Sequence, residues 1–197
     1  MKRMKFRNLE YSRTVVKNNI LKVWDATSLD ERHDWYREAF EYGQLLAEKT
    51  RDLSKACGVI AALSPMKRWS ENKKLALDCV LGQRVGHMGA FVRKAEAILA
   101  SDGSDEAILD ILSGSKIQSF YLNIRYPDKI GAVTIDRHAI RIAIGQWLDD
   151  DQLAITANQY EFFVQCYQLA AMKRGVSPQL MQSATWVHIR NNKSLLK

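Results

Sequence analysis

The sequence predicts an all-α protein that folds as one helical domain over residues 1–197. Three observations support this fold class. Apolar residues recur at helical spacing along most of the chain. Ser or Asp precedes several of these segments at positions where such residues cap helices. No stretch shows the alternation of apolar and polar residues that is typical of a β-strand, and the hydrophobic fraction of 47% is sufficient for a buried core.

The first expected helices lie before Pro65. A helix is expected over residues 28–49, because Ser28-Leu-Asp-Glu31 matches a capping box and apolar residues follow at helical spacing. Residues 53–63 form a nearly continuous apolar run that favours a buried, central helix. Pro65 predicts the end of this helix, because the residue before a proline disfavours the helical conformation.

Caps and glycines divide the rest of the chain. Ser70, Ser104, Asp136 and Ser177 stand where helices are expected to begin, and Pro178 fits the first helical position after Ser177. The helices expected after Pro65 cover residues 70–82, 89–102, 104–112, 115–124, 137–145, 158–174 and 177–191.

Composition limits the partners and the compartment. The net charge of +7 favours a polyanionic partner such as DNA, because clustered cations release counterions from phosphates. The three cysteines lack any CxxC spacing, so we expect buried thiols in a reducing cytoplasm, with no disulfide, metal cluster or cofactor. The basic N-terminus is followed by no long apolar stretch, which argues against a signal peptide or membrane contact. We expect a monomer.

The segment 104–145 contains the residues that favour a chemical function. Gly114, between Ser113 and Ser115, predicts a turn whose backbone approaches a phosphate closely at the start of the next helix. Lys116 follows as an amine that can attack the sugar carbon of a nucleotide flipped out of DNA. Asp136 then supplies a carboxylate that can stabilise positive charge on the sugar as the glycosidic bond breaks.

These residues lie within a recognisable pattern. LSGSKIQSF followed by VTIDRHAIRIAIG resembles the hairpin-plus-aspartate signature of the endonuclease III and oxoguanine glycosylase superfamily. VIAALSPMKRWSEN and GAFVRKAEAIL resemble upstream helices of that superfamily, so the similarity covers Gly58 to Gly145. The resemblance implies a two-lobed helical bundle of the helix-hairpin-helix DNA glycosylase type. It also implies that Lys116 is the lyase lysine and Asp136 the catalytic carboxylate.

The chain also departs from that superfamily. Ser113-Gly114-Ser115 replaces the usual pair of glycines around an apolar residue, and the cluster-binding cysteines of endonuclease III are absent. The runs Lys116 to Asn123 and Thr134 to His138, with the closing SATWVHIR, resemble compact bacteriophage proteins that use this fold to make hypermodified thymines. Three functions therefore stay open: a DNA glycosylase with lyase activity, a phage DNA base-hypermodification enzyme in the host cytoplasm, and a non-catalytic DNA-binding module.

Each candidate residue also has a structural interpretation. Asp136 can be only a helix cap, and Lys116 only an exposed lysine in a first turn. Trp69 and Asn72 follow the Pro65 turn, where such side chains can probe a target base, but they can equally pack or cap.

The helix after Asp136 contains three further candidates. Arg137, His138 and Arg141 can contact DNA, or they can be a solvated basic face and a structural histidine. The aromatic residues at helical spacing later in the chain are expected to form core; they are Tyr160, Phe162, Phe163 and Tyr167.

Overall fold

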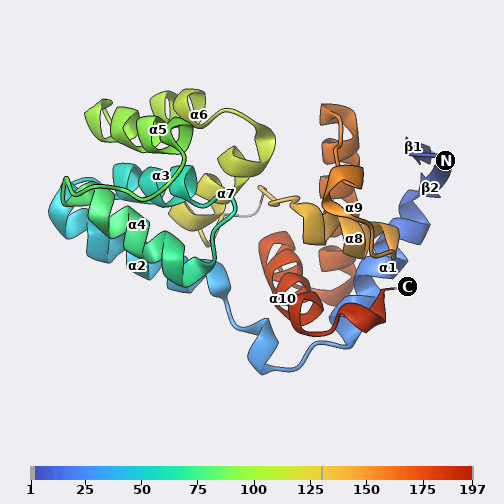
Figure 1. Cartoon of the computed structure of the whole chain (residues 1–197). Helices are drawn as coiled ribbons and strands as arrows, with labels where there is room; N and C mark the ends of the chain where they lie inside the picture. Colours follow the sequence, from blue (N-terminus) through green and yellow to red (C-terminus); the bar gives the residue numbers. More distant parts are fainter. Residues whose placement is uncertain (1–2, 130, 197) are drawn as a thin grey trace. The chain divides into compact units, whose positions relative to one another are not determined.

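The computed structural model describes residues 3–129 and 131–196, and these residues are mostly helical. The expectation of a mainly helical fold is therefore confirmed. The chain forms two compact units, a terminal unit from residues 1–35 and 130–197 and a central unit from residues 36–129. Figure 1 labels the helices of each. Within the described residues, no helix is long and apolar enough to cross a membrane.

The terminal unit combines both ends of the chain. Helices α1, α8, α9 and α10 pack against one another, and a short hairpin packs on α1 and α9. Its elements are β1 (Arg3–Phe6), β2 (Leu9–Ser12), α1 (Arg13–Asp25), the 3₁₀ turn η1 (Asp30–Arg32), α8 (Arg137–Ile144), the 3₁₀ turn η2 (Asp150–Gln152), α9 (Ala157–Arg174), α10 (Pro178–Asn191) and the 3₁₀ turn η3 (Lys193–Leu195).

The core of the terminal unit lies between these helices. Ile20 of α1, Ile142 of α8, Phe163 of α9 and Met181 of α10 belong to one buried apolar cluster. Phe162, Phe163 and Tyr167 are buried in that cluster, and Tyr160 packs against it half-buried, so the expectation that these aromatic residues form core is confirmed.

The hairpin corrects the expectation that the chain contains no strand. β1 and β2 pair antiparallel, with Met4 opposite Tyr11 and Phe6 opposite Leu9. Met4 and Phe6 are buried while their neighbours in β1 are exposed, so the alternation is present but extends over only four residues. A signal this short is below the usual length of a recognisable strand.

The central unit is built around one buried helix. α3 packs against α4, α5, α6 and α7, and every residue from Ala56 to Leu63 is buried, as the apolar run predicts. A Cβ at Gly58 would lie 2.9 Å from Cγ2 of Ile98, so α5 approaches α3 where the side chain is absent. The elements of this unit are α2 (Trp35–Thr50), α3 (Leu53–Leu63), α4 (Trp69–Val80), α5 (Gly89–Ala100), α6 (Asp105–Leu112) and α7 (Ser115–Arg125).

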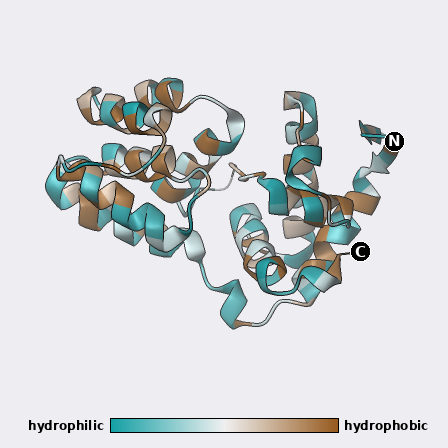
Figure 2. Ribbon diagram, in the orientation of Figure 1, coloured by the Kyte–Doolittle hydropathy of each residue, from teal (hydrophilic) through white to brown (hydrophobic). Residues whose placement is uncertain are grey.

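Both units contain helices with polar and apolar faces, as Figure 2 shows.

All three cysteines are buried, as expected. Burial raises the pKa of Cys57 and Cys166 to about 12 and that of Cys79 to about 11. The thiols are therefore protonated at neutral pH and are poor nucleophiles.

Most expected helix boundaries agree with the structure to within one or two residues, but the helix expected over 28–49 is wrong at its start. Ser28 and Glu31 do bond reciprocally, with Ser28 N donating to Glu31 Oε2 at 2.8 Å and Glu31 N donating to Ser28 Oγ at 3.2 Å. These bonds close the short turn η1, and α2 begins only at Trp35.

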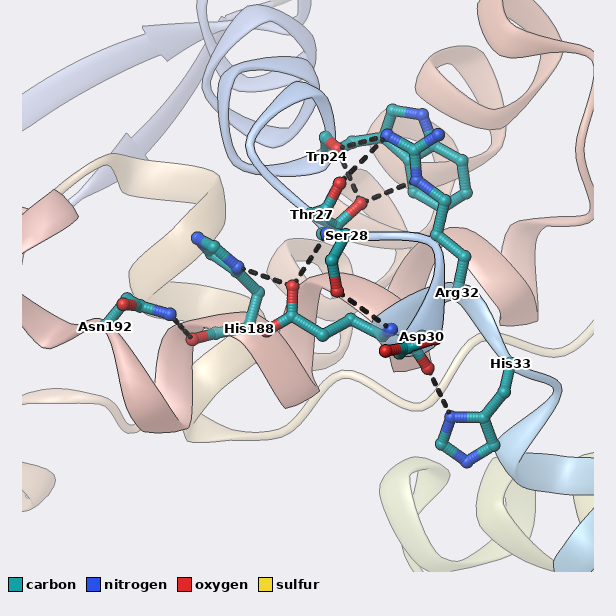
Figure 3. A network of polar contacts seen from close by, with 9 residues as sticks. Trp24, Thr27, Ser28, Asp30, Arg32, His33, His188 and Asn192 are labelled. Carbon is teal, nitrogen blue, oxygen red and sulfur yellow. Dashed lines mark hydrogen bonds and ion pairs between the residues drawn. The ribbon is translucent and has the colours of Figure 1, made fainter.

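The Ser28 turn belongs to a polar network that fixes the segment after α1 against α10 (Figure 3). His188 Nδ1 of α10 lies 2.9 Å from Glu31 Oε2, and Arg32 Nε donates to Thr27 Oγ1 at 2.7 Å. Burial alone would raise the pKa of the Glu31 carboxyl, but the bonds from Ser28 and His188 lower it overall. The turn therefore has a structural function in the terminal unit.

Candidate functional site

The turn between α6 and α7 is the first part of the candidate site, in the central unit. Ser104 caps α6, whose last residue is Leu112, and α7 begins after Gly114. Gly114 has a φ of +87°, which favours glycine, and nothing lies within 4 Å of the position of a Cβ there. The exposed backbone at Gly114 is therefore accessible to a large ligand such as a DNA strand.

Lys94 of α5 stabilises this turn through two hydrogen bonds. Its Nζ donates to the Leu112 carbonyl at 2.7 Å and to Ser113 Oγ at 2.6 Å. Ser113 has a φ of +46°, which is a strained value for a residue with a side chain. Lys94 thus satisfies a carbonyl at the end of α6 and fixes the strained residue. In the sequence, Lys94 lies within GAFVRKAEAIL, and this pattern indicated no function for it.

Lys116 is the second residue of α7, and its side chain is exposed. Within the described residues, its amine has no hydrogen bond or ion pair. Nucleophilic lysines are usually activated by burial or by a neighbouring cation. The structure provides neither for Lys116 within the central unit, so its nucleophilic role rests on the resemblance alone.

Asp136 is the best-supported member of the candidate site and belongs to the terminal unit. It is the N-cap of α8, as the sequence predicts, and its Oδ1 accepts a bond from Ala139 N at 2.8 Å. Its Oδ2 accepts a bond from Trp186 Nε1 of α10 at 3.1 Å. Each oxygen can accept a further bond. The half-buried carboxylate is therefore fixed at both oxygens and still able to bind a ligand.

Two elements fix the approach to Asp136. Val133, Thr134 and Ile135 are buried. The Tyr160 hydroxyl donates to the Val133 carbonyl at 2.9 Å and accepts from Ile135 N at 3.1 Å. This bridge from α9 sets the position at which the chain enters α8.

Trp186 is the residue that the sequence analysis missed at this site. Its ring contacts that of Trp35 at 6.0 Å, and the guanidinium of Arg190 lies 4.5 Å from its centroid. The cation–π contact with Arg190 favours one orientation of the Trp186 ring. In this orientation the ring N–H is directed at the Asp136 carboxylate. The run SATWVHIR, quoted for its resemblance, was the only signal for this residue.

His138 lies half-buried in the first turn of α8. Burial lowers its pKa, the Asp136 carboxylate opposes this, and the cations of Arg141, Arg137 and Arg190 lower the pKa further. The ring is therefore mainly neutral at pH 7. Its Nδ1 is shielded from solvent and has no hydrogen-bond partner in the described part of the chain.

The arginines of α8 mainly hold the loop that follows it. Arg141 is only 4% exposed, and its Nε donates to the Leu148 carbonyl at 2.8 Å. Its Nη2 donates to Asp150 Oδ1 at 2.7 Å, and Arg137 pairs with the other oxygen of Asp150. The interpretation of Arg141 as a DNA-facing residue is therefore wrong, whereas Arg137 is exposed and stays a candidate.

The two candidates on α4 differ. Trp69 is half-buried, and its Nε1 donates to Glu38 Oε1 of α2 at 3.0 Å. Asn72 is 2% exposed and donates from Nδ2 to the Ile60 carbonyl at 3.2 Å. Asn72 therefore links α4 to α3, and its buried side chain has no exposed surface for a DNA contact. The expected base contact by Asn72 is therefore corrected.

The candidates thus form two groups. Ser113, Gly114, Ser115 and Lys116 share the exposed turn in the central unit. Asp136, Arg137 and His138 share the start of α8 in the terminal unit with Trp186 and Arg190. Among residues 3–129 and 131–196, no group of three His, Cys, Asp or Glu side chains is placed to hold a metal ion.

The family model described as "Family of unknown function (DUF7178)" matches residues 2–193, so the chain belongs to this family. Comparisons with curated proteins and with solved structures gave no match.

Proposed function

We propose that this member of DUF7178 is a DNA glycosylase-like enzyme that acts on a base flipped out of DNA. The observation that carries the proposal is the Asp136 carboxylate, held by Ala139 N and Trp186 Nε1. A carboxylate fixed before the reaction stabilises the positive charge that develops on the sugar as the base leaves, without first having to reorganise.

DNA binding is assigned to the turn between α6 and α7. Gly114 gives a strand close access to the backbone, the start of α7 supplies its positive dipole end, and Lys116 adds a charge. These contacts fix the phosphate backbone and do not read sequence. The net charge of +7 supports association with a polyanion.

The resemblance adds a lyase step to the proposal. The neutral amine of Lys116 attacks the anomeric carbon of the sugar, the glycosidic bond breaks, and the base leaves with a proton taken from water. The nitrogen then loses one proton, the C–O bond of the sugar ring breaks, the ring oxygen takes up a proton, and a protonated imine forms. Borohydride reduces such an imine to a stable amine, which links the protein covalently to DNA.

The experiment incubates the protein with duplexes that contain different damaged or modified bases, with and without borohydride. Released base and a trapped adduct that disappears in Lys116→Ala support a glycosylase with lyase activity. Base release without trapping supports a glycosylase that uses Asp136 and water. The matched control for Lys116→Ala is Lys74→Ala, an exposed lysine of α4.

A non-catalytic DNA-binding module is the second candidate, favoured by the exposure of Lys116 and its lack of partners in the described chain. It predicts salt-dependent duplex binding with no base release, and binding that is unchanged in Asp136→Asn.

A further inference from the structure

A pocket outside the candidate site lies in the central unit between two loops. Met66 and Lys67 of the turn between α3 and α4 line one side, and residues 84–88, between α4 and α5, line the other. Its volume is about 440 Å³. Binding sites for small organic ligands have volumes of about 300–1,000 Å³, so the pocket has the size for one.

The pocket is positively charged. Its described lining contains Lys67 and Arg84 and no acidic residue. Neither cation has a hydrogen bond or ion pair with another residue in the described ranges. Burial lowers the pKa of His87, and the nearby charge of Lys67 lowers it further. An anionic group would be attracted here without displacing an existing partner.

The pocket also has an apolar surface. Met66 is 72% exposed and Met88 55% exposed, although both are large hydrophobic residues. Methionine sulfur makes favourable contacts with aromatic rings, and flexible methionine side chains adapt to flat ligands. Met66 has a φ of +59°, a strained value for a side-chain residue, which indicates that its exposed position is imposed by the surrounding turn.

The wall between these groups is anchored. The ring of His87 packs on Phe91 of α5 at 4.9 Å between centroids. His87 Nε2 is shielded and has no partner within the described residues, and a Cβ at Gly86 would meet nothing within 4 Å. The contact with Phe91 therefore places the His87 ring in the wall of the pocket.

We propose that this pocket binds a nucleotide, with its phosphate between Lys67 and Arg84 and its base against Met66 and Met88. Two adjacent cations suit a phosphate, and exposed thioethers suit a flat aromatic ring. The nucleotide is either free or one unit of a DNA strand. This inference goes beyond the proposed function, because it requires neither Asp136 nor Lys116.

The experiment follows the full-length protein by NMR, using labelled methionine methyl groups and histidine side chains. The probes are thymidine monophosphate, thymidine, inorganic phosphate and a short oligothymidylate. We expect thymidine monophosphate to shift the signals of Met66, His87 and Met88 and to bind at least about tenfold more tightly than thymidine or phosphate. Tighter binding of the oligothymidylate assigns the site to a strand, and equal or weaker binding assigns it to a free nucleotide.

Variants test the named contacts. Lys67→Gln and Arg84→Gln are each expected to weaken thymidine monophosphate binding about tenfold, because each removes a charge-assisted bond. Lys74→Gln is the matched control and is expected to retain the affinity of the unchanged protein. No shift with any probe, phosphate binding as tight as the nucleotide, or unchanged affinity in both pocket variants would overturn the proposal.

The test is independent of the glycosylase proposal. Asp136→Asn and Lys116→Ala are expected to leave the pocket affinity for thymidine monophosphate unchanged. Loss of base release with intact nucleotide binding therefore separates the two proposals, as does the reverse result.

Discussion

Helix α8 begins at a carboxylate that is already engaged, whereas α7 begins at an exposed glycine that supplies no capping side chain. Asp136 accepts bonds from Ala139 and Trp186, and the chain before it is buried. Gly114 is exposed, and Lys94 of α5 bonds the Leu112 carbonyl just before this turn.

The difference between the two helix starts indicates different functions. A rigid, half-buried carboxylate suits charge stabilisation at one reacting atom, because its geometry is set before the reaction. An exposed turn with an accessible backbone suits binding to a DNA phosphate, because phosphate contacts do not depend on the base sequence.

The largest effect is expected for Asp136→Asn. Asparagine keeps an oxygen for Ala139 N and is a good N-cap, so the variant removes the charge and keeps the cap. We expect the rate of base release to fall by at least about 100-fold. We expect a smaller loss of thermal stability than in Asp136→Ala, because the cap is kept and only the bond from Trp186 Nε1 is lost. Single-turnover kinetics and a thermal melt measure the two quantities. Asp136→Ala is the contrasting variant, expected to lose about 1 kcal/mol of stability as well.

A smaller loss is expected for Trp186→Phe, which removes the donor to Asp136 Oδ2 and keeps an aromatic ring. The loss of this bond, worth about 1.5–3 kcal/mol because its acceptor is charged, is expected to lower the single-turnover rate about tenfold or more. Affinity for duplex DNA is expected to stay constant. The control is Trp147→Phe, since Trp147 stacks on Arg141 and Lys193. Equal losses in both variants would argue against a special function for Trp186.

The sequence predicts Asp136 as an N-cap but not its partner. The cap is a local pattern, and Asp136 occupies it as expected. The bond to Trp186 joins α8 to α10 across 50 residues and depends on how these helices pack. No local rule contains that information.

The sequence does contain a pattern that predicts the burial of Asn72. Asn72 precedes Leu75, Ala76 and Cys79 at spacings of three, four and seven residues, and all four are buried on one face of α4. The spacing therefore places Asn72 on the apolar stripe, although its polar side chain favours a surface interpretation.

The bounds of α3 and α10 were predicted to within one residue, because Pro65 marks the end of α3 and Ser177-Pro178 the start of α10.

Gly114→Ala tests the exposed turn. A φ of +87° is unfavourable for alanine, so the variant is expected to destabilise the central unit by about 1–3 kcal/mol. Duplex binding is expected to weaken, because the added methyl group lies where the strand approaches. Urea unfolding and fluorescence anisotropy measure both effects. Gly175→Ala, also at positive φ but in the terminal unit, is the control for strain alone and should leave DNA affinity intact.

Lys116→Ala is expected to act through charge. Removing one phosphate contact should reduce the slope of log affinity against log salt by about 0.9 for duplex DNA. Anisotropy titrations at several salt concentrations measure the slope. Lys74→Ala should leave it unchanged, and equal slopes for all three proteins would show that Lys116 does not touch the DNA backbone.

The smallest effect is expected from His138 as the pH changes. Its pKa is lowered in the folded protein, so the unfolded chain binds more protons below the ordinary value of 6.5. The stability associated with the neutral ring is therefore full above pH 6.5 and decreases as the pH falls through the lowered pKa. Unfolding free energies of the unchanged protein and His138→Gln, measured between pH 7.5 and about pH 5, should differ in slope over this window. Parallel curves would contradict the expected contribution.

The central claim is that Asp136 recognises positive charge on the sugar of a flipped nucleotide. The most direct measurement compares affinities for two duplexes, one with a cationic pyrrolidine abasic analogue and one with a neutral tetrahydrofuran analogue. We expect the protein to bind the cationic duplex at least about tenfold more tightly, and Asp136→Asn to lose this preference and keep the affinity for the neutral duplex. Equal affinities for the two duplexes, or a preference that persists in Asp136→Asn, would contradict it.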